Sequence, residues 1–351
     1  MPRLTSLDLS YCLQVSDSGL LSVLLPQDPS GREDPRYGQC CQLSRLLVAG
    51  CQNITGLSIR QALLRLPHLA VCDFPDTAGL VHQLVLDTKM ESSLRLRSLH
   101  SGLDSGQDSL AVSTKMCQEA EHAFIVLHPA QTAHCLLSLL DLQTVRELHL
   151  REELADDEAV SETGLMLGPV LVRHGQTLVS LNIAECHHVN VSLICTSCTQ
   201  LTHLVLLWNK SYVSDHTEGG GAFPGLKTVN LAFLTDKDGD ANLVRREMSS
   251  TDLCLILSSP TLQSLKVSHS RQLTDLSYTS VYSKNSMVNL KILELDQCHH
   301  ISMDSLEYFL EDPNSLESVR FIKCEQITKR EIQKYQRKVN KLKWNIRIDW
   351  S

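Results

Sequence analysis

The sequence has few aromatic residues and no long apolar run. Aromatic side chains make up 5% of the 351 residues. The longest apolar stretch, residues 164–172, has about half the length of a membrane-spanning helix, and the first residues lack the apolar core of a secretory signal. The net charge of −8 argues against general binding to nucleic acid or to anionic membranes. We therefore expect a cytoplasmic protein, with the nucleus as the alternative, that binds neither membranes nor nucleic acid.

Sequence motifs of enzymes are also missing. There is no Walker loop, no G-x-G-x-x-G, no H-E-x-x-H and no G-x-S-x-G in a suitable context. We expect no enzymatic activity of this chain and no cofactor. The 13 cysteines are odd in number and spread over a large chain without a signal, which indicates reduced thiols and not a disulfide framework.

What the chain does contain is one short phrase repeated many times. The first copy is LTSLDL at residues 4–9. Clear copies follow: LSRLLV (43–48), LVSLNI (178–183), LTHLVL (201–206), LKTVNL (226–231), LQSLKV (262–267), LKILEL (290–295) and LESVRF (316–321). Weaker copies are LPHLAV (66–71), LRSLHS (96–101), HAFIVL (122–127) and VRELHL (145–150), and KWNIRI closes the chain. The spacing lies at the long end of the range for leucine-rich repeats.

Five copies share a finer register after the phrase. The sixth residue after its last apolar position is Val or Ile, the seventh is Ser, Thr or Asn, and the eleventh is Leu or Ile. This pattern predicts a short strand with one buried face, then a capped helix. The third residue is always cysteine, which we expect to be buried as a small apolar side chain. These cysteines are Cys12, Cys51, Cys186, Cys298 and Cys324. Cys117 stands outside the register, and we expect it to tolerate replacement.

This pattern resembles the cysteine-containing class of leucine-rich repeats (LRR) of F-box/LRR proteins and the mitotic-exit-antagonist group, with ribonuclease-inhibitor-like architecture. LTSLDLSYCLQVSDSGL (4–20), LSRLLVAGCQNITGLSI (43–59) and LKILELDQCHHISMDSL (290–306) carry the resemblance. It implies an α/β fold, a leucine-rich-repeat solenoid or horseshoe with a parallel β-sheet on the concave face and helices on the convex face. We expect one solenoid over residues 1–351 with about twelve or thirteen strands. Its repeats are irregular at 67–177, and a capping helix and strand occupy 328–351.

The chain opens inside this pattern. In the repeat class a C-x-x-L segment often precedes the strand, as at 198–201 and 40–43, and residues 1–4 have the same spacing with Met1 in place of cysteine. No capping segment precedes Leu4, although solenoids need one. We interpret the start as a cut at an internal boundary of the array, which leaves out the F-box. A first repeat that caps itself is the alternative.

Strand residues that alternate with the buried leucines form the predicted binding face. Its expected centre, at 147–151 and 203–208, mixes aromatic, aliphatic and charged side chains, as protein-binding patches do. A position of Trp208 packed under the following loop is the alternative to an exposed one. The candidate contact residues are Glu147, His149, Arg151, Asn182, His203, Val205, Leu207, Trp208, Asn230, Lys266, Glu294 and Arg320.

Three other features have two interpretations each. Insertions at 26–41, 102–115 and 209–225 are rich in Gly, Pro, Asp and Ser and predict loops, either on a binding face or without function. Residues 323–343 hold eight basic and two acidic residues, which fits a solvated capping helix or a docking patch for an acidic partner. The CTSC segment at 195–198, with His187, His188 and His203 nearby, suggests zinc. Because Cys186 and Cys198 already have repeat positions, we expect no metal.

Two functions fit the resemblance. In the first, the horseshoe binds a protein substrate as part of an F-box/LRR type (SCF) ubiquitin ligase receptor in ubiquitin-dependent protein degradation. A Skp-type adaptor and a cullin are then partners only if an upstream F-box exists. In the second, the chain is a stand-alone LRR scaffold or regulatory protein with no ubiquitin-ligase link. In both cases a protein substrate or adaptor binds the concave face.

Overall fold

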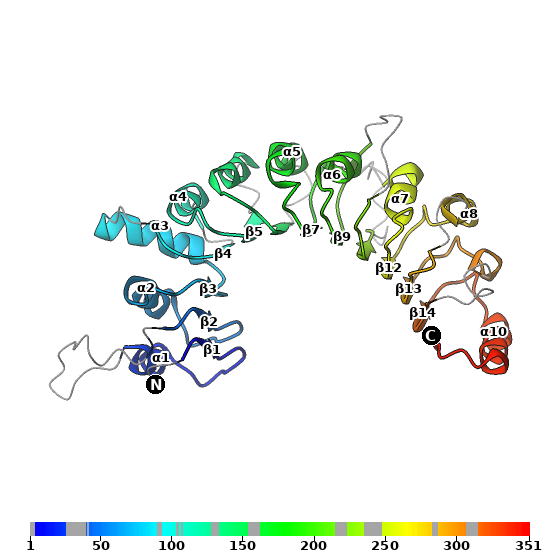
Figure 1. The fold of residues 1–351 in the computed structure, drawn as a ribbon, viewed down its shortest axis with the longest axis horizontal. Helices are drawn as coiled ribbons and strands as arrows, with labels where there is room; N and C mark the ends of the chain where they lie inside the picture. The colour runs from blue at the N-terminus through cyan, green and yellow to red at the C-terminus, as the bar shows by residue number, and fades with distance from the viewer. Residues whose placement is uncertain are drawn as a thin grey trace. The chain divides into compact units, whose positions relative to one another are not determined.

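The computed structural model describes residues 4–25, 40, 42–89, 93–102, 105–106, 108–127, 133–153, 162–214, 223–234, 248–282, 287–306 and 315–351. Internal contacts divide the chain into two compact units, Met1–Ala155 and Asp156–Ser351. Both units are built mainly from short strands that are each followed by a helix (Figure 1).

Strands of the first unit pair in parallel. β1 (Ser6–Asp8), β2 (Arg45–Leu47) and β3 (Val71–Cys72) pair in the order β1-β2-β3. β4 (Ser98–Ser101), β5 (His122–Leu127) and β6 (Glu147–Glu152) pair in the order β4-β5-β6. The helices are α1 (Asp17–Leu24), α2 (Gly56–Arg65), α3 (Thr77–Thr88), α4 (Ser109–Met116) and the 3-10 helix η2 (Ala133–Asp141). They lie on one side of the strands (Figure 1). We call the other side the open face.

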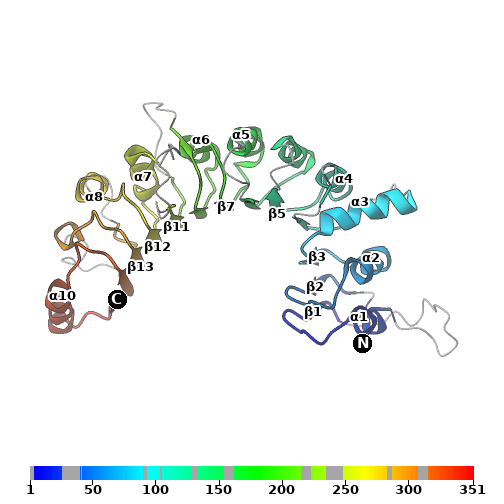
Figure 2. The same cartoon turned by 180° about the vertical axis from the view of Figure 1, so that it is seen from behind.

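Strands of the second unit form a longer parallel sheet. Its order is β7 (Ser180–Ala184), β9 (His203–Leu207), β11 (Thr228–Ala232), β12 (Ser264–Ser268), β13 (Ile292–Asp296), β14 (Ser318–Ile322) and β15 (Arg347–Trp350). The short strands β8 (Val189–Asn190) and β10 (Tyr212–Val213) pair separately. The helices α5 (Thr163–His174), α6 (Val191–Ser197), α7 (Ser250–Leu257), α8 (Asp275–Tyr282) and α10 (Lys329–Leu342) again leave one face of the sheet open (Figure 2).

These elements confirm the predicted fold class. Both clear and weaker copies of the phrase contain parallel strands, and thirteen strands besides β8 and β10 lie within the described residues. Four predicted helix caps accept a backbone N–H: Ser16, Thr55, Asn190 and Thr328. The expectation of one domain over 1–351 stays a prediction. Within the described segments, every helix is too short or too polar to cross a bilayer.

A left-handed residue follows seven of the described strands, and it was not predicted from the sequence. Two residues after the last apolar position of the repeated phrase, φ lies between 49° and 71°. The backbone N–H of this residue usually donates to the carbonyl at the end of the next strand, as from Trp208 to Ala232 at 2.7 Å. The turn therefore joins neighbouring repeats. The residues at this position are Tyr11, Gly50, Glu185, Trp208, His269, Gln297 and Lys323.

Four of the five repeat cysteines are buried, as predicted, but Cys12 is exposed. The reason lies in what covers the thiol. Cys12 belongs to the first repeat that the structure describes, and none of the described residues before it covers its thiol. In three of the four buried cases the thiol donates to a carbonyl oxygen of the preceding repeat: Cys51 to Leu9 (2.9 Å), Cys298 to Val267 (3.5 Å) and Cys324 to Leu295 (3.5 Å). The Cys186 thiol donates to the Ala184 carbonyl of its own repeat at 3.2 Å.

Two other expectations need correction. Cys117 is fully buried, because it ends a helix as Cys198 does. A fully buried thiol fills core volume, so replacement by a smaller side chain should cost stability at this site as well. The insertion at 102–115 is not a loop throughout, since α4 begins at Ser109. The Ser113 hydroxyl of α4 is satisfied by the carbonyl of Ala78 at 2.7 Å, which lets a polar helix pack in the core. The insertion at 209–225 likewise contains β10, whereas 26–41 lies almost wholly outside the described residues.

Candidate protein-binding site

A stack of three rings crosses the open face of the first unit. His100, Phe124 and His149 occupy paired positions on β4, β5 and β6. The ring centroids of His100 and Phe124 are 4.5 Å apart with an interplanar angle of 12°, and those of Phe124 and His149 are 4.4 Å apart at 27°. Parallel pairing places every second side chain of neighbouring strands side by side on one face, which brings the rings together. We call these three residues the aromatic row.

Burial keeps the aromatic row neutral at ordinary pH. It lowers the pKa of His100 to about 4, against a smaller opposing effect of the nearby Asp73 carboxylate. Burial also lowers the pKa of His149, which Glu147 partly opposes. A neutral imidazole offers one hydrogen-bond donor and one acceptor. Beside the row, His122 Nδ1 lies 3.0 Å from Glu147 Oε2. The face therefore combines flat apolar rings with directional polar atoms.

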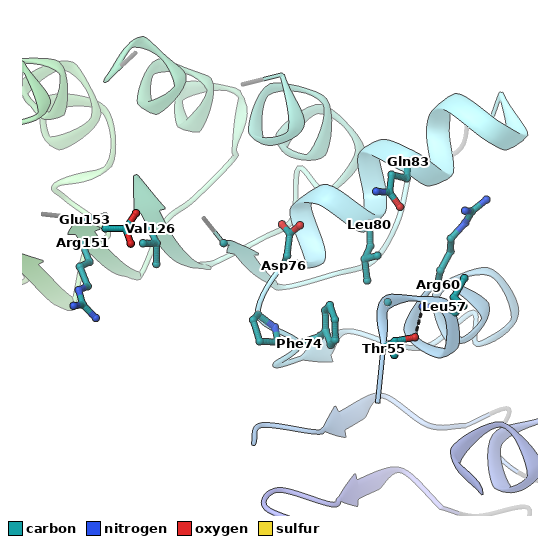
Figure 3. Close-up of a pocket in the computed structure, with 13 residues that line it drawn as sticks. Thr55, Leu57, Arg60, Phe74, Asp76, Leu80, Gln83, Val126, Arg151 and Glu153 are labelled. Carbon is teal, nitrogen blue, oxygen red and sulfur yellow. Dashed lines mark hydrogen bonds between the residues drawn. The ribbon is translucent and has the colours of Figure 1, made fainter. Parts of the chain in front are cut away.

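A pocket of about 910 Å³ adjoins the aromatic row. Two residues beyond each ring along its strand lie Gly102, Val126 and Arg151, and all three line the pocket. The other lining residues come from α2 and the residue before it, from α3 and the turn before it, and from the residue after β6. They are Thr55, Gly56, Leu57, Arg60, Phe74, Pro75, Asp76, Leu80, Gln83 and Glu153. Figure 3 shows Arg151 and Glu153 on one side of the pocket and Leu57 and Arg60 on the other.

Local partners hold the polar groups of the pocket wall. Asp76 caps α3 by accepting the N–H of Gly79 at 2.9 Å and also accepts the Ser105 hydroxyl. Arg60 pairs with Asp87.

The apolar wall is accessible, since Leu57 is 72% exposed. A Cβ at Gly56 would lie 2.6 Å from Leu80 Cδ2 and displace that side chain, so glycine sets the approach of α2 to α3. With an apolar wall that includes Leu57, Phe74 and Leu80, the pocket can receive apolar side chains.

The open face of the second unit carries one long row. Six of the predicted residues lie in register across neighbouring strands, in the order Asn182, Val205, Asn230, Lys266, Glu294 and Arg320. Their charges alternate at one end of the row. Glu294 Oε2 lies 3.5 Å from Lys266 Nζ and 3.8 Å from Arg320 Nη1, and Arg320 Nη2 lies 3.8 Å from Asp349 Oδ2.

The other predicted residues of the second unit lie at or next to the ends of β9. Leu207 pairs with Ala184 and Ala232, and His203 is exposed at the start of β9. Trp208 is 45% exposed in a left-handed turn, which supports the exposed alternative. Glu147, His149 and Arg151 lie together on β6 in the first unit. The predicted centre that joins them to His203–Trp208 stays a prediction.

His100, Phe124 and the pocket were not predicted from the sequence. The first two lie in the weaker copies LRSLHS and HAFIVL, whose outward positions were not included in the candidate face. Aligning these copies with the clear ones would have identified both residues. Leu57 and Phe74 follow no repeat position, and only the packing of α2 against α3 brings them to the pocket.

The possible zinc ligands do not form a site among the residues that the structure describes, where no three His, Cys, Asp or Glu side chains could hold a metal ion together. Cys195 and Cys198 are buried in and after α6. Burial raises the pKa of Cys195 to about 11 and of Cys198 to about 12, so both are protonated thiols at neutral pH.

Neither a protein-family model nor a curated protein matches the sequence. Among solved structures, the chain is similar to one described as the crystal structure of the Rad7 and Elc1 complex in yeast, with a TM-score of 0.52 and 16% sequence identity. The alignment covers 97% of this chain and 67% of that chain. At this identity the similarity shows the fold alone. Together with the repeated parallel strands, it confirms a leucine-rich-repeat solenoid.

Proposed function

We propose that this chain recognises a protein through the open face of its strands, as the substrate-binding part of an F-box/LRR type (SCF) ubiquitin ligase receptor. The role is recognition, without a catalytic step by this chain. The observation that carries the proposal is the aromatic row beside an accessible apolar pocket. Protein interfaces concentrate their binding energy in such groups of aromatic and apolar side chains with charged neighbours.

The pocket and the aromatic row suit a protein partner in size and chemistry. A volume of about 910 Å³ lies at the upper end of the range for small-molecule pockets. The adjoining row extends the contact surface across three strands. A partner segment would place apolar side chains against Leu57 and Phe74 and hydrogen-bond the imidazoles of the row.

The solved structure of similar fold supports a role in assembly, because its description is of Rad7 in complex with a second protein, Elc1. A partner of the adaptor kind is therefore part of the proposal for this chain. The ligase link itself rests on the resemblance of the repeats to F-box/LRR proteins, and it requires an F-box upstream of Leu4. A stand-alone LRR scaffold or regulator remains the second candidate, favoured by the same open face without an adaptor.

Affinity capture with the full chain tests recognition by the open face. Arg151→Glu probes the first unit and Leu207→Asp the second, after circular dichroism shows that both variants are folded. The control is Arg173→Glu, which makes the same charge change at an exposed position of α5. We expect Arg151→Glu to lose partners that the wild type and the control retain. If both open-face variants retain every partner, the proposal is wrong.

A second experiment separates the two candidate functions. The protein produced from its natural gene, including any upstream coding sequence, is purified and probed for a Skp-type adaptor and a cullin. Their presence in stoichiometric amounts supports the ligase receptor. If the open-face partner is recovered without adaptor or cullin, the chain is a stand-alone scaffold.

A further inference from the structure

The C-terminal helix α10 has an apolar and a basic side. Ile332, Tyr335 and Val339 are buried, and with 3.6 residues per turn they share one side of the helix. Arg330, Arg337 and Lys341 are exposed on the opposite side. We call these three residues the basic stripe. Helix geometry separates the first two by about 10 Å along the axis and the last two by about 6 Å.

The stripe has no carboxylate of its own to neutralise it. Glu331 is the single acidic residue of α10, and its carboxylate accepts hydrogen bonds from the Thr328 N–H at 2.8 Å and the Thr328 hydroxyl at 2.7 Å. Among the described residues, the ion pairs do not include any member of the stripe. Lys334 and Lys338 have interactions of their own and are not part of the stripe.

The charge of the stripe contrasts with the rest of the chain. Residues 323–343 carry a net charge of +6 in a chain of −8, so the other residues carry −14. A short acidic segment can lie along the stripe within its local positive potential. A long polyanion such as nucleic acid would extend over the negative remainder and be repelled. The contrast favours an acidic protein segment as the occupant.

We propose that the basic stripe docks an acidic segment of a partner protein. A helical partner with Glu at positions i, i+7 and i+11 presents carboxylates at the same spacing as Arg330, Arg337 and Lys341. Exposed ion pairs are individually weak and are screened by salt, so binding needs all three pairs. Because α10 lies on the helix side of the second unit, this surface is separate from the open face and independent of the function proposed for it.

Titration calorimetry and fluorescence anisotropy with the full chain test the proposal. The probe is a labelled Ala- and Gln-rich helical peptide with Glu at i, i+7 and i+11, and its partner probe has Gln at those positions. We expect the Glu peptide to bind at low salt, and the Gln peptide to bind at least about tenfold more weakly. The double variant Arg330→Glu, Arg337→Glu should lose at least about tenfold in affinity for the Glu peptide.

The matched control is the double variant Lys115→Glu, Arg173→Glu, which makes the same net charge change at exposed positions of α4 and α5. It should bind the Glu peptide within about twofold of the wild type. Equal loss in the two double variants, or equal binding of the Glu and Gln peptides, would overturn the proposal. Tighter binding of single-stranded DNA than of the Glu peptide would identify a nucleic-acid surface and overturn it as well.

Discussion

A repeat cysteine in this fold acts as a hydrogen-bond donor as well as a small apolar side chain. The thiol of Cys298 reaches the Val267 carbonyl of the preceding repeat, and burial raises its pKa to about 12, which keeps it protonated. The register in the sequence was enough to predict burial at four of five sites. It failed at Cys12 because burial there depends on a neighbouring repeat. It also failed to predict that Cys117 is buried, because that residue ends a helix instead of following a strand.

Replacing a repeat cysteine by aspartate should destabilise the protein more at a buried site than at an exposed one. Cys298→Asp puts a carboxylate in a fully buried position, and we expect the free energy of unfolding to fall by at least about 2 kcal/mol. Cys12→Asp changes an exposed side chain, and we expect a loss below about 0.5 kcal/mol. Urea unfolding of both variants measures the difference. Equal losses at the two sites would show that the preceding repeat does not determine sensitivity.

His100 should make stability depend on pH. Its folded pKa of about 4 lies below the ordinary value of 6.5 because of burial. The unfolded chain therefore binds the proton more readily, and stability is lost as pH falls from about 6.5 towards 4. At pH 5 this amounts to about 2 kcal/mol. Above about pH 7 the imidazole is neutral in both states, and no such loss occurs.

The control for this effect is His100→Phe, which keeps a ring against Phe124 but cannot be protonated. Urea unfolding at pH 7.5 and pH 5 gives the loss for each protein. We expect the loss in the variant to be smaller than in the wild type by about 2 kcal/mol. If both proteins lose the same free energy of unfolding between pH 7.5 and pH 5, His100 does not take up a proton on unfolding in this range. Its pKa is then not lowered by burial in the row.

At the scale of elements, the clear copies of the repeat predict strands and helix caps well. The weaker copies contain His100 and Phe124 of the aromatic row, and their irregular pattern does not by itself predict that role. Alternating leucines mark β7 or β13 because each buried position is filled by an apolar side chain. In β4 the buried positions include Ser98 and Ser101, which weakens the pattern. The aromatic row also depends on which strands pair, and distance along the chain does not show this. The left-handed turn leaves a trace only at Gly50, since the other copies use larger residues.

A substitution of Trp208 can separate the effect of the left-handed backbone on stability from the effect of the side chain. A left-handed backbone costs a non-glycine residue about 1 kcal/mol or more, so Trp208→Gly removes strain as it removes partly exposed apolar area. We expect the free energy of unfolding to change by less than about 1 kcal/mol. The neighbouring Leu206→Gly should cost more than about 3 kcal/mol, because Leu206 is fully buried. Thermal unfolding compares the two, and a similar loss in both would mean that Trp208 is a core residue.

At the scale of the whole molecule, the sequence predicts one solenoid over 1–351, whereas internal contacts define the units Met1–Ala155 and Asp156–Ser351. In a solenoid each repeat is stabilised by its neighbours, so a continuous array unfolds cooperatively over several repeats. The continuity of the sequence pattern cannot decide this, since the repeats at 67–177 are irregular. The stability of the least stable repeats and of their contacts with neighbouring repeats determines whether the whole chain unfolds together.

The positions of the tryptophans allow a test of whether the two units unfold together. The three tryptophans are Trp208, Trp344 and Trp350, so intrinsic fluorescence reports on the second unit alone. Far-UV circular dichroism reports on the helices and strands of both units. If the chain is one cooperative solenoid, urea transitions followed by the two signals coincide in midpoint and slope. We expect coincidence, because strands and capped helices repeat in both units without a change of architecture. A circular dichroism transition with an additional step that fluorescence does not follow would show that the first unit unfolds independently, and the single-domain prediction would then be wrong.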